Sequence, residues 1–359
     1  MNNKTFFIIA FLSTAAFFSS CRKDDSPDTK DYTVPATYHF SNANYTKSTQ
    51  LAKMTVELDA YLKKANTGSA LVALDQTVVN NLFANGNSPF ADPSLNNAGF
   101  GIGSVIADGP LYKSYADSVL IFNTGAVGSE GVGGFIPRSA NKIVVGPTGL
   151  EYGQAYVKGT MGALFFKEAV KMLTTVKTMA AADTTAAQAA WDAAFGCLTV
   201  PADYDTAIVY ANSDPNRPLL WGGYLAERGK AIQAGGILFQ AFLKGRAAIG
   251  GYDVKVRDEQ ADLILDKWEQ LAAAAALHYV TAPTASASVG NYGSQLHALS
   301  EGFGFIASLK YRPSRSKLTA ANFATLDKII HTNFYALLNQ PGFTDLVAAQ
   351  NILKATYGL

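Results

Sequence analysis

The residues best suited to chemistry lie in segment 295–304, where a histidine and a carboxylate are four positions apart. On a helix, His297 and Glu301 fall on one face together with the small residues Gly304 and Ser308. Small residues let a neighbouring helix approach closely, so we expect the pair to be partly buried. A buried charge is costly unless it is paired or bound to a metal ion. The pattern therefore predicts either two ligands of a metal ion, completed from facing helices, or a hydrogen-bonded pair that fixes helix packing.

Motifs of the common hydrolases and nucleotide-binding proteins do not occur in the chain. The sequence contains no His-Glu-x-x-His, no Gly-x-Ser-x-Gly and no glycine-rich loop ending in Gly-Lys-Ser/Thr. The other histidines have structural interpretations: His39 lies near the N-terminal tether, His278 caps the end of a helix, and His331 stands alone on an apolar helix. We therefore predict no catalytic residue, and the sequence favours a protein that is not an enzyme.

Composition indicates a large globular body that does not bind nucleic acid. Of the 359 residues, 48% are apolar and 16% are charged, which provides ample apolar surface for a core. The formal net charge is +1 and no long basic run occurs, so the chain lacks the positive surface that phosphate backbones require. Cys197 is the one cysteine besides Cys21, and its Ala/Phe/Leu neighbours predict a small buried hydrophobic residue.

Helical periodicity dominates from residue 46 onward. Between Thr46 and Lys64, apolar residues recur at steps of three and four, which predicts an amphipathic helix. Further helices are predicted over residues 154–176, 185–195, 221–249, 258–279, 294–310, 320–338 and 344–357. Since strand-like alternation is hard to find anywhere, the sequence predicts an all-α fold, either one helical bundle or a pair of bundles.

Residues 86–150 interrupt the helical pattern. They hold many of the 31 glycines, and only the part from Leu111 to Phe122 is predicted to be helical. Loops of this length inside a compact domain are usually functional or disordered. We expect a long irregular insertion that gives conformational freedom near a ligand entrance or between helices.

The N-terminus carries the features of an exported lipoprotein. Lys4 provides a positive region, and residues 6–18 form an apolar segment whose length suits a signal peptide rather than a membrane span. The end of the segment resembles the lipobox of bacterial lipoproteins, in which small residues precede a cysteine: Phe18-Ser19-Ser20-Cys21. We therefore predict a signal peptide over residues 1–20 and two acyl chains on Cys21, which together anchor a protein stably.

Residues 21–36 are predicted to form a flexible tether, because they contain too few apolar groups to fold alone. Directly behind the cysteine, Lys23-Asp24-Asp25 resembles the surface-export signal of Bacteroidota lipoproteins. The sequence thus predicts an outer-membrane lipoprotein exposed on the cell surface, with a plain solvated linker and a periplasmic position as the alternative. Its expected partners are the membrane, through the lipid anchor, and an outer-membrane or surface uptake protein.

Five segments form a combined pattern that covers most of the chain behind the tether. They are Tyr38-His39-Phe40, Lys158-Gly159-x-x-Gly162-Ala163-Leu164-Phe165-Phe166, Trp191-Asp192-x-Ala194-Phe195-Gly196, Lys244-Gly245-Arg246-Ala247-Ala248-Ile249 and His297-Ala298-Leu299-Ser300-Glu301-Gly302-Phe303-Gly304-Phe305-Ile306. Together they resemble an uncharacterised family of Bacteroidota lipoproteins, a domain of unknown function. That family is distantly similar to the imelysins, helical extracytoplasmic proteins associated with iron uptake and once classed as peptidases. The resemblance implies an imelysin-like domain over residues 37–359, with two up-and-down helical bundle halves at 37–215 and 216–359.

The resemblance bears on the candidate metal ligands. Imelysins carry Gly-x-His-x-x-Glu, whereas here Glu301 follows His297 by four positions and Ser300 occupies the matching place. Both spacings keep the two side chains on one helical face, so the resemblance implies His297 and Glu301 as metal ligands. Imelysin halves also resemble each other, and Trp191-Asp192 and Trp268-Glu269 form a faint internal repeat. Asp192 and Glu269 are then candidate further ligands near His297; alternatively, each acid is solvated beside a core tryptophan.

Three functions remain open from the sequence. The first is a ligand-binding component linked to the acquisition of iron, haem or another metal, with a transition-metal ion, iron foremost, bound as the ligand. The second is a surface scaffold or interaction protein without a small-molecule site. The third is an imelysin-type metallopeptidase, which would need a complete set of zinc ligands around His297.

Overall fold

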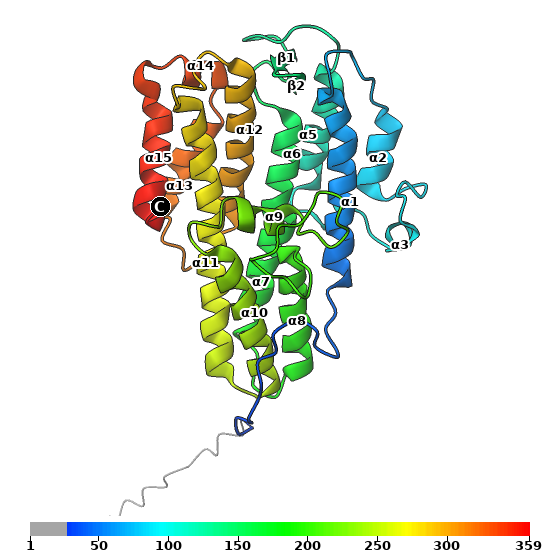
Figure 1. The fold of residues 1–359 in the computed structure, drawn as a ribbon, viewed down its shortest axis with the longest axis vertical. Helices are drawn as coiled ribbons and strands as arrows, with labels where there is room; N and C mark the ends of the chain where they lie inside the picture. Colours follow the sequence, from blue (N-terminus) through cyan, green and yellow to red (C-terminus); the bar gives the residue numbers. More distant parts are fainter. Residues whose placement is uncertain (1–26) are drawn as a thin grey trace, which may run out of the picture.

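Helices that run along one common axis account for most of the chain (Figure 1). The structure, a computed structural model, describes residues 27–359, so the predicted signal peptide and Cys21 lie outside the described residues. The long helices are α1 (Thr46–Lys63), α5 (Gly109–Phe122), α6 (Tyr152–Thr160), α7 (Lys167–Val176), α8 (Thr184–Leu198), α10 (Ala234–Gly250), α11 (Val254–Thr281), α12 (Tyr292–Ser308), α13 (Ala320–Ile330) and α15 (Thr344–Tyr357). The short ones are α2 (Gln76–Ala84), α3 (Pro93–Asn96), α4 (Ile102–Val105), α9 (Leu220–Glu227) and α14 (Phe334–Leu338). Within the described range, no helix is long and apolar enough to cross a membrane.

The predicted all-α fold is confirmed, but two of the predicted helices are broken. Residues 221–249 form α9 and α10, because Gln233 takes a left-handed conformation, with φ of 54°, that a helix cannot continue. Residues 320–338 form α13 and α14. Here the Asn333 side chain accepts a hydrogen bond from the Tyr335 backbone N–H and so begins a new helix.

A small antiparallel hairpin corrects the expectation that strands are hard to find. Strand β1 (Gly134–Arg138) pairs with β2 (Asn141–Val145). All residues of β2 from Lys142 to Val145 are buried, so the strand lacks the alternation of apolar and polar side chains that reveals a half-exposed strand. The predicted irregular insertion, residues 86–150, therefore contains a strand pair as well as α5.

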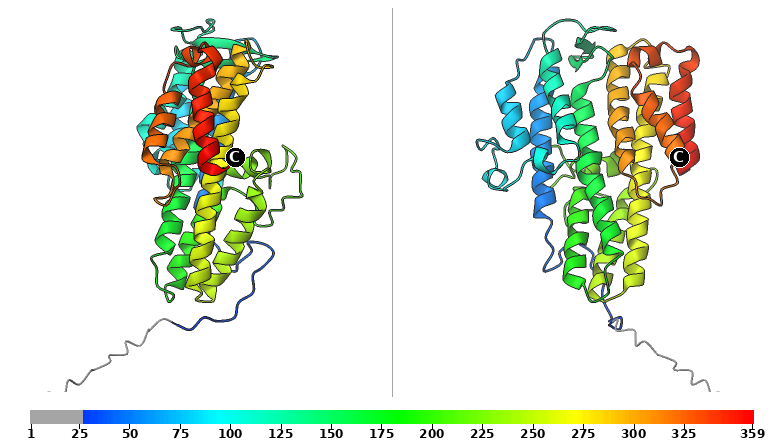
Figure 2. Two further views of the ribbon diagram at one scale, coloured as in Figure 1. Left: turned by 90° about the vertical axis from the view of Figure 1, so that its left-hand side faces the viewer. Right: turned by 180° about the vertical axis from the view of Figure 1, so that it is seen from behind.

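The helices pack in two groups stacked along the long axis (Figures 1 and 2). Helices α7, α8, α10 and the first half of α11 pack together at the end where the described chain begins, and α1, α5, α6, α12 and α15 lie toward the hairpin. Helix α11 runs through both groups, and α6 continues into α7 through a π-helical segment, Met161–Phe166. Because α8 packs on α10, helices from both sides of the expected boundary at 215/216 contact each other. The division into halves 37–215 and 216–359 stays a prediction.

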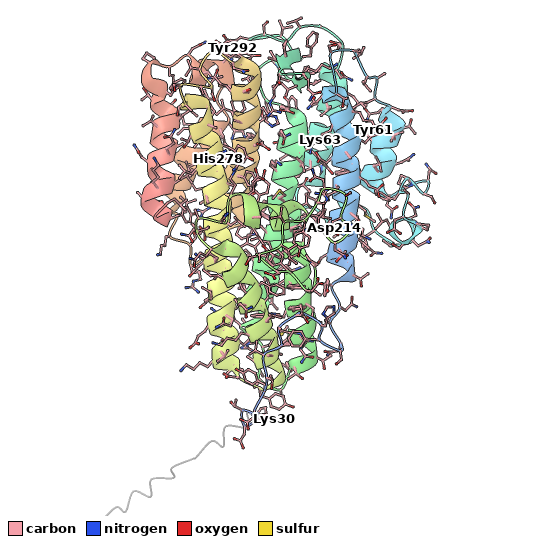
Figure 3. All side chains as sticks on the ribbon, viewed as in Figure 1. Lys30, Tyr61, Lys63, Asp214, His278 and Tyr292 are labelled. Atoms are coloured by element: carbon pink, nitrogen blue, oxygen red, sulfur yellow. The ribbon has the colours of Figure 1, made fainter. Side chains whose placement is uncertain are left out.

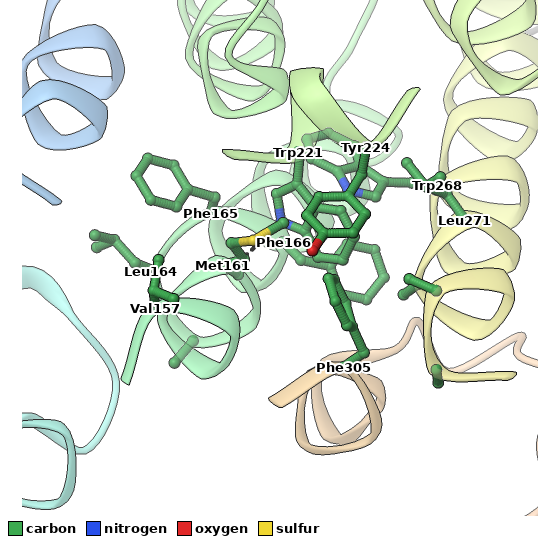
Figure 4. Close-up of a cluster of buried hydrophobic side chains, with 14 of the residues drawn as sticks. Val157, Met161, Leu164, Phe165, Phe166, Trp221, Tyr224, Trp268, Leu271 and Phe305 are labelled. Carbon is green, nitrogen blue, oxygen red and sulfur yellow. Dashed lines mark hydrogen bonds between the residues drawn. The ribbon is translucent and has the colours of Figure 1, made fainter. Parts of the chain in front are cut away.

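An aromatic cluster joins these helices near the middle of α11 (Figure 4). The ring of Trp221 on α9 lies 6.1 Å from that of Trp268 on α11 and 5.7 Å from that of Phe305 on α12, and all three side chains are buried. The indole N–H of Trp221 donates to the Met161 carbonyl at 2.7 Å, so the π-helical segment satisfies the one polar group of this ring. The cluster thus ties α6, α9, α11 and α12 together.

Glycines let α6 and α12 approach each other closely. A Cβ atom added at Gly304 would lie 2.3 Å from the Lys158 Cβ, and one added at Gly162 would lie 2.5 Å from the Ser308 Cα. Carbon atoms that are not bonded do not come this close, so both positions require glycine at the present distance between the helices. The close contact brings the start of α6 against the face of α12 that carries His297.

We expect Gly304→Ala to destabilise the protein by about 1–3 kcal/mol, because the new methyl group forces α6 and α12 apart. Gly236→Ala in α10 is the matched control, since a Cβ there meets no atom within 4 Å. The control should stabilise the protein by about 0.5–1 kcal/mol, as alanine does in an unhindered helix. Urea unfolding of both variants and the parent measures the two effects; equal stabilities of the variants would contradict the close contact.

Candidate functional site

His297 lies on the face of α12 that packs against the start of α6. Asn291 caps α12 by accepting a hydrogen bond from the Ser294 backbone N–H at 3.1 Å, and His297 follows in the second turn. The Nδ1 atom of His297 lies 2.6 Å from Oε2 of Glu151, the residue that precedes α6. An ionised carboxylate only accepts, so Nδ1 carries the hydrogen of this bond. The carboxylate of Glu151 is 1% exposed, and the imidazole is therefore held from inside the protein.

Glu151 is itself fixed by several bonds. Its Oε1 atom accepts a hydrogen bond from Asn66 Nδ2 at 2.7 Å, and its backbone N–H donates to Ser300 Oγ at 2.8 Å. Ser300 donates in turn to the Leu296 carbonyl, one turn earlier in α12. Sequence reasoning missed Glu151. An acidic residue at the start of a helix usually meets solvent and the helix dipole, and the one available signal was its position directly before the predicted helix.

Glu301 lies one turn after His297 and contacts both the imidazole and a lysine of α6. Its Oε2 atom lies 3.9 Å from His297 Nε2, and its Oε1 atom lies 3.3 Å from Lys158 Nζ. The Lys158 ammonium also lies over the Tyr224 ring, 5.1 Å from the ring centroid. Burial alone would lower the pKa of Lys158, but the carboxylates of Glu301 and Asp59 outweigh burial and raise that pKa. The lysine is therefore charged.

A third carboxylate extends this group into α1. Asp59 is buried and pairs with Lys63 at 2.6 Å, while its Oδ1 atom has no hydrogen-bond partner among the described residues. Burial raises the pKa of Asp59, and the charges of Lys63 and Lys158 offset the rise only in part. We call the whole group the ionic cluster; its members are Asp59, Lys63, Glu151, Lys158, His297 and Glu301. With every carboxylate ionised, its charges sum to zero when the imidazole is protonated.

Asp192 has partners of its own, away from the ionic cluster. Its Oδ1 atom accepts hydrogen bonds from Arg246 Nε at 2.7 Å and from the Tyr38 hydroxyl at 2.8 Å. The Arg246 and Asp192 side chains are 2% and 1% exposed, so they form a buried salt bridge in which each charge compensates the other. Arg246 also donates to Asn42 Oδ1 at 2.9 Å, and the group thereby fastens the N-terminal segment to α8 and α10.

Glu269 lies on α11 next to the end of the C-terminal helix. Its Oε1 atom accepts hydrogen bonds from the Tyr357 hydroxyl at 2.6 Å and from the Ser316 hydroxyl. Burial raises the pKa of the Glu269 carboxyl, and these two donors offset the rise only in part. Like Asp192, it is buried, so the alternative expectation of two solvated acids is wrong.

The structure therefore divides the four candidate ligands among three places. His297 and Glu301 meet in the ionic cluster, whereas Asp192 and Glu269 each have a separate set of partners. Within residues 27–359, no group of three or more His, Cys, Asp or Glu side chains is arranged to hold a metal ion. Any metal ion at His297 and Glu301 would take its other ligands from outside the chain.

The residues expected to be structural have simple surroundings. Cys197 is buried as predicted, and burial raises the pKa of its thiol to about 12. His331 lies just after α13, and its Nδ1 atom is 2.7 Å from a backbone carbonyl of that helix. Helix α11 continues past His278, whose ring packs edge-on against Tyr279 at 4.9 Å. The expected cap at His278 is thus replaced by an aromatic contact.

His297 and Glu301 are the part of the ionic cluster that can take a cation. Because Glu151 holds the imidazole through Nδ1, the other nitrogen, Nε2, is the one that faces Glu301 Oε2. Carboxylates often orient metal-binding histidines in this way. Nitrogen and oxygen ligands bind transition-metal ions at about 2.0–2.2 Å, so the distance of 3.9 Å between the two atoms suits one shared ion. The Lys158 ammonium opposes a bare cation, since it pairs with the same carboxylate.

The fold and the site together define an all-helical protein with an ionic cluster buried between closely packed helices. Residues 35–356 match the sequence model of a family described as Domain of unknown function (DUF4856), and the chain belongs to that family. No curated protein and no solved structure matches the chain. Membership of a domain family of unknown function agrees with the resemblance found in the sequence, whereas the relation to imelysins and to Bacteroidota stays a prediction.

We expect Glu301→Leu to lower the free energy of unfolding by about 3 kcal/mol, because it leaves the Lys158 ammonium buried without its partner. The double variant Lys158→Met/Glu301→Leu should lose much less than the sum of the two single variants, since neither charge is then left alone. Urea unfolding of the four proteins measures the coupling between the two side chains. Strictly additive losses would show that these two groups do not interact.

Proposed function

We propose that the protein is a lipid-anchored binding protein for metal acquisition, with iron, haem or another metal complex as its ligand. The observation that carries this proposal is the fixed imidazole of His297: buried Glu151 holds Nδ1 and leaves Nε2 beside the carboxylate of Glu301. A nitrogen and an oxygen ligand positioned before binding are the first elements of a metal site. The resemblance to imelysins, in which a histidine and a glutamate share one helical face, supports the same function.

Two protein ligands leave most coordination positions of an iron ion to other atoms. Haem supplies four nitrogen atoms and needs only axial ligands from a protein, and a chelator similarly brings several ligands of its own. We therefore propose that the metal arrives in complexed form. A site with few protein ligands also favours release, which suits a protein that passes a metal on.

The proposal includes an outer-membrane location with exposure on the cell surface. Its support lies in the sequence, in the lipobox-like motif that ends at Cys21 and in the Lys23-Asp24-Asp25 that follows. The backbone N–H of Lys30 donates to the Gly251 carbonyl at 2.9 Å, so the described chain begins against the turn between α10 and α11. Figure 3 shows Lys30 at this end and Lys63, a member of the ionic cluster, toward the other end. A protein anchored at Cys21 would thus hold the cluster away from the membrane.

Cys21→Ser is expected to abolish incorporation of labelled fatty acid and to move the protein from the membrane fraction to the soluble fraction, because the acylated sulfur is lost. Ser20→Ala keeps a small residue before the cysteine and is the control, with labelling as in the parent. Metabolic labelling and cell fractionation measure both properties. Persistent membrane association of the Cys21→Ser protein would overturn the predicted anchor.

Elemental analysis tests the metal-binding function. The full chain, purified in detergent without an affinity tag and incubated with ferric citrate or haemin, is expected to retain iron after gel filtration. His297→Ala should remove this binding, and Glu151→Gln should weaken it by about 10–100-fold, as the loss of a carboxylate that orients a metal-binding histidine does. The control is His331→Ala, a histidine outside the ionic cluster, which should bind as the parent. A parent protein that retains no iron, copper or zinc would sink the proposal.

A second function, recruitment of a protein partner, is favoured by apolar side chains exposed near the hairpin. Val127, which forms a bridge to β1, is 65% exposed, Val132 is 50% exposed, and Tyr292 at the start of α12 is 40% exposed. Exposed apolar residues that gather in one region often mark an interaction surface. Figure 3 shows Tyr292 at the end opposite to Lys30. Under this function, His297→Ala would lower stability, since it leaves Glu151 without its partner, and would change no metal binding.

A further inference from the structure

A cavity of about 200 Å³ opens beside α11, where the end of α15 and the segment before α13 approach this helix. Its lining includes Leu263, Lys267, Glu269, Lys317 and Tyr357. None of these residues belongs to the ionic cluster. The volume is smaller than the roughly 300–1,000 Å³ of sites that hold drug-sized ligands, so the cavity suits a small metabolite.

The wall of the cavity contains a buried carboxylate with one oxygen available. Both donors to Glu269, the hydroxyls of Tyr357 and Ser316, bond to Oε1. The Oε2 atom has no hydrogen-bond partner in the part of the chain that the structure describes. A buried carboxylate oxygen is stabilised by a donor. A ligand with an ammonium or hydroxyl group would provide that donor from within the cavity.

Two lysines of the cavity bring positive charge that no carboxylate compensates. Lys267 Nζ donates to the neutral acceptors Gln270 Oε1, at 2.7 Å, and Ile232 O, at 3.3 Å. Lys317 is exposed and forms no ion pair within residues 27–359. The acid nearest to them in the lining, Asp266, already pairs with Arg315 at 3.1 Å. The cavity therefore favours a ligand that carries a negative group.

We propose that this cavity binds a free amino acid. Its ammonium group would donate to Glu269 Oε2, its carboxylate would accept from Lys317 and Lys267, and its side chain would contact Leu263. The two polar requirements of the cavity, a donor for the buried carboxylate and an anion for the lysines, are met by one small zwitterion. This proposal is independent of metal binding, because the two sites share no residue.

Isothermal titration of the full chain in detergent tests the proposal with three probes: L-leucine, L-threonine and L-glutamate. At least one probe should bind, and its N-acetyl and amide derivatives should bind about tenfold more weakly or less, since each lacks one of the two charges. Absence of heat from all three probes would overturn the proposal. Equal binding of the blocked derivatives would do the same, because it would reveal an apolar cleft without recognition of the charged groups.

Variants locate the site. Glu269→Gln keeps an acceptor for Tyr357 and Ser316 but removes the negative charge, and Lys317→Gln removes an exposed positive charge. Each is expected to weaken binding of the best probe by about tenfold. The exposed Lys310, outside the cavity, provides the matched control Lys310→Gln, which should bind as the parent. Because Lys317 is exposed, its variant should fold normally, and unchanged affinity in it and in Glu269→Gln would contradict the assignment.

Discussion

The close contact between α6 and α12 is the constraint on which the rest of the structure depends. At Gly304 the two helices meet with no room for a methyl group, so polar side chains beside this contact are withdrawn from water. A charge in such a position is stable only with a partner. Each polar residue at the contact has one, His297 in Glu151 and Glu301 in Lys158. The glycines and the ionic cluster are thus two parts of one packing arrangement, and neither would be stable without the other.

The π-helical segment Met161–Phe166 lets one continuous helix serve both groups of helices. A π-helical segment alters the turn of a helix, and such segments are frequent at functional sites. Before it, α6 faces α12; after it, α7 packs on α8 at the other end of the molecule. The Met161 carbonyl accepts the indole N–H of Trp221, which packs against Phe305, the neighbour of Gly304 in α12. The aromatic cluster therefore begins on the same turn of α12 where the close helix contact lies, and it ties the ionic cluster to the rest of the core.

Periodicity predicted the fold better than it predicted the partners of individual residues. The small residues on the His297 face correctly predicted a closely packed, partly buried histidine, because that inference needs only one helix. Glu151 could not be found in this way, since it lies 146 positions from His297 and reaches it only through the packing of α6 on α12. Asp192 and Glu269 show the same limit: each follows a tryptophan on an alanine-rich helix, yet one meets an arginine and the other a tyrosine. A local pattern reveals a buried acid; only the fold reveals what compensates it.

Lys158 bears on which metal species the proposed site would accept. Its ammonium pairs with Glu301, the same carboxylate that would bind the metal, so the two cations would lie roughly 5 Å apart. Two unit charges at that distance repel by about 3 kcal/mol at an effective dielectric constant near 20, and a divalent ion doubles the repulsion. A free metal ion is therefore disfavoured beside the charged lysine. A complex with negative groups of its own, such as the propionates of haem or the carboxylates of a chelator, would instead be attracted by the same ammonium. The lysine thus favours a complexed metal over a free one, which is the same preference that a pair of protein ligands imposes through coordination number.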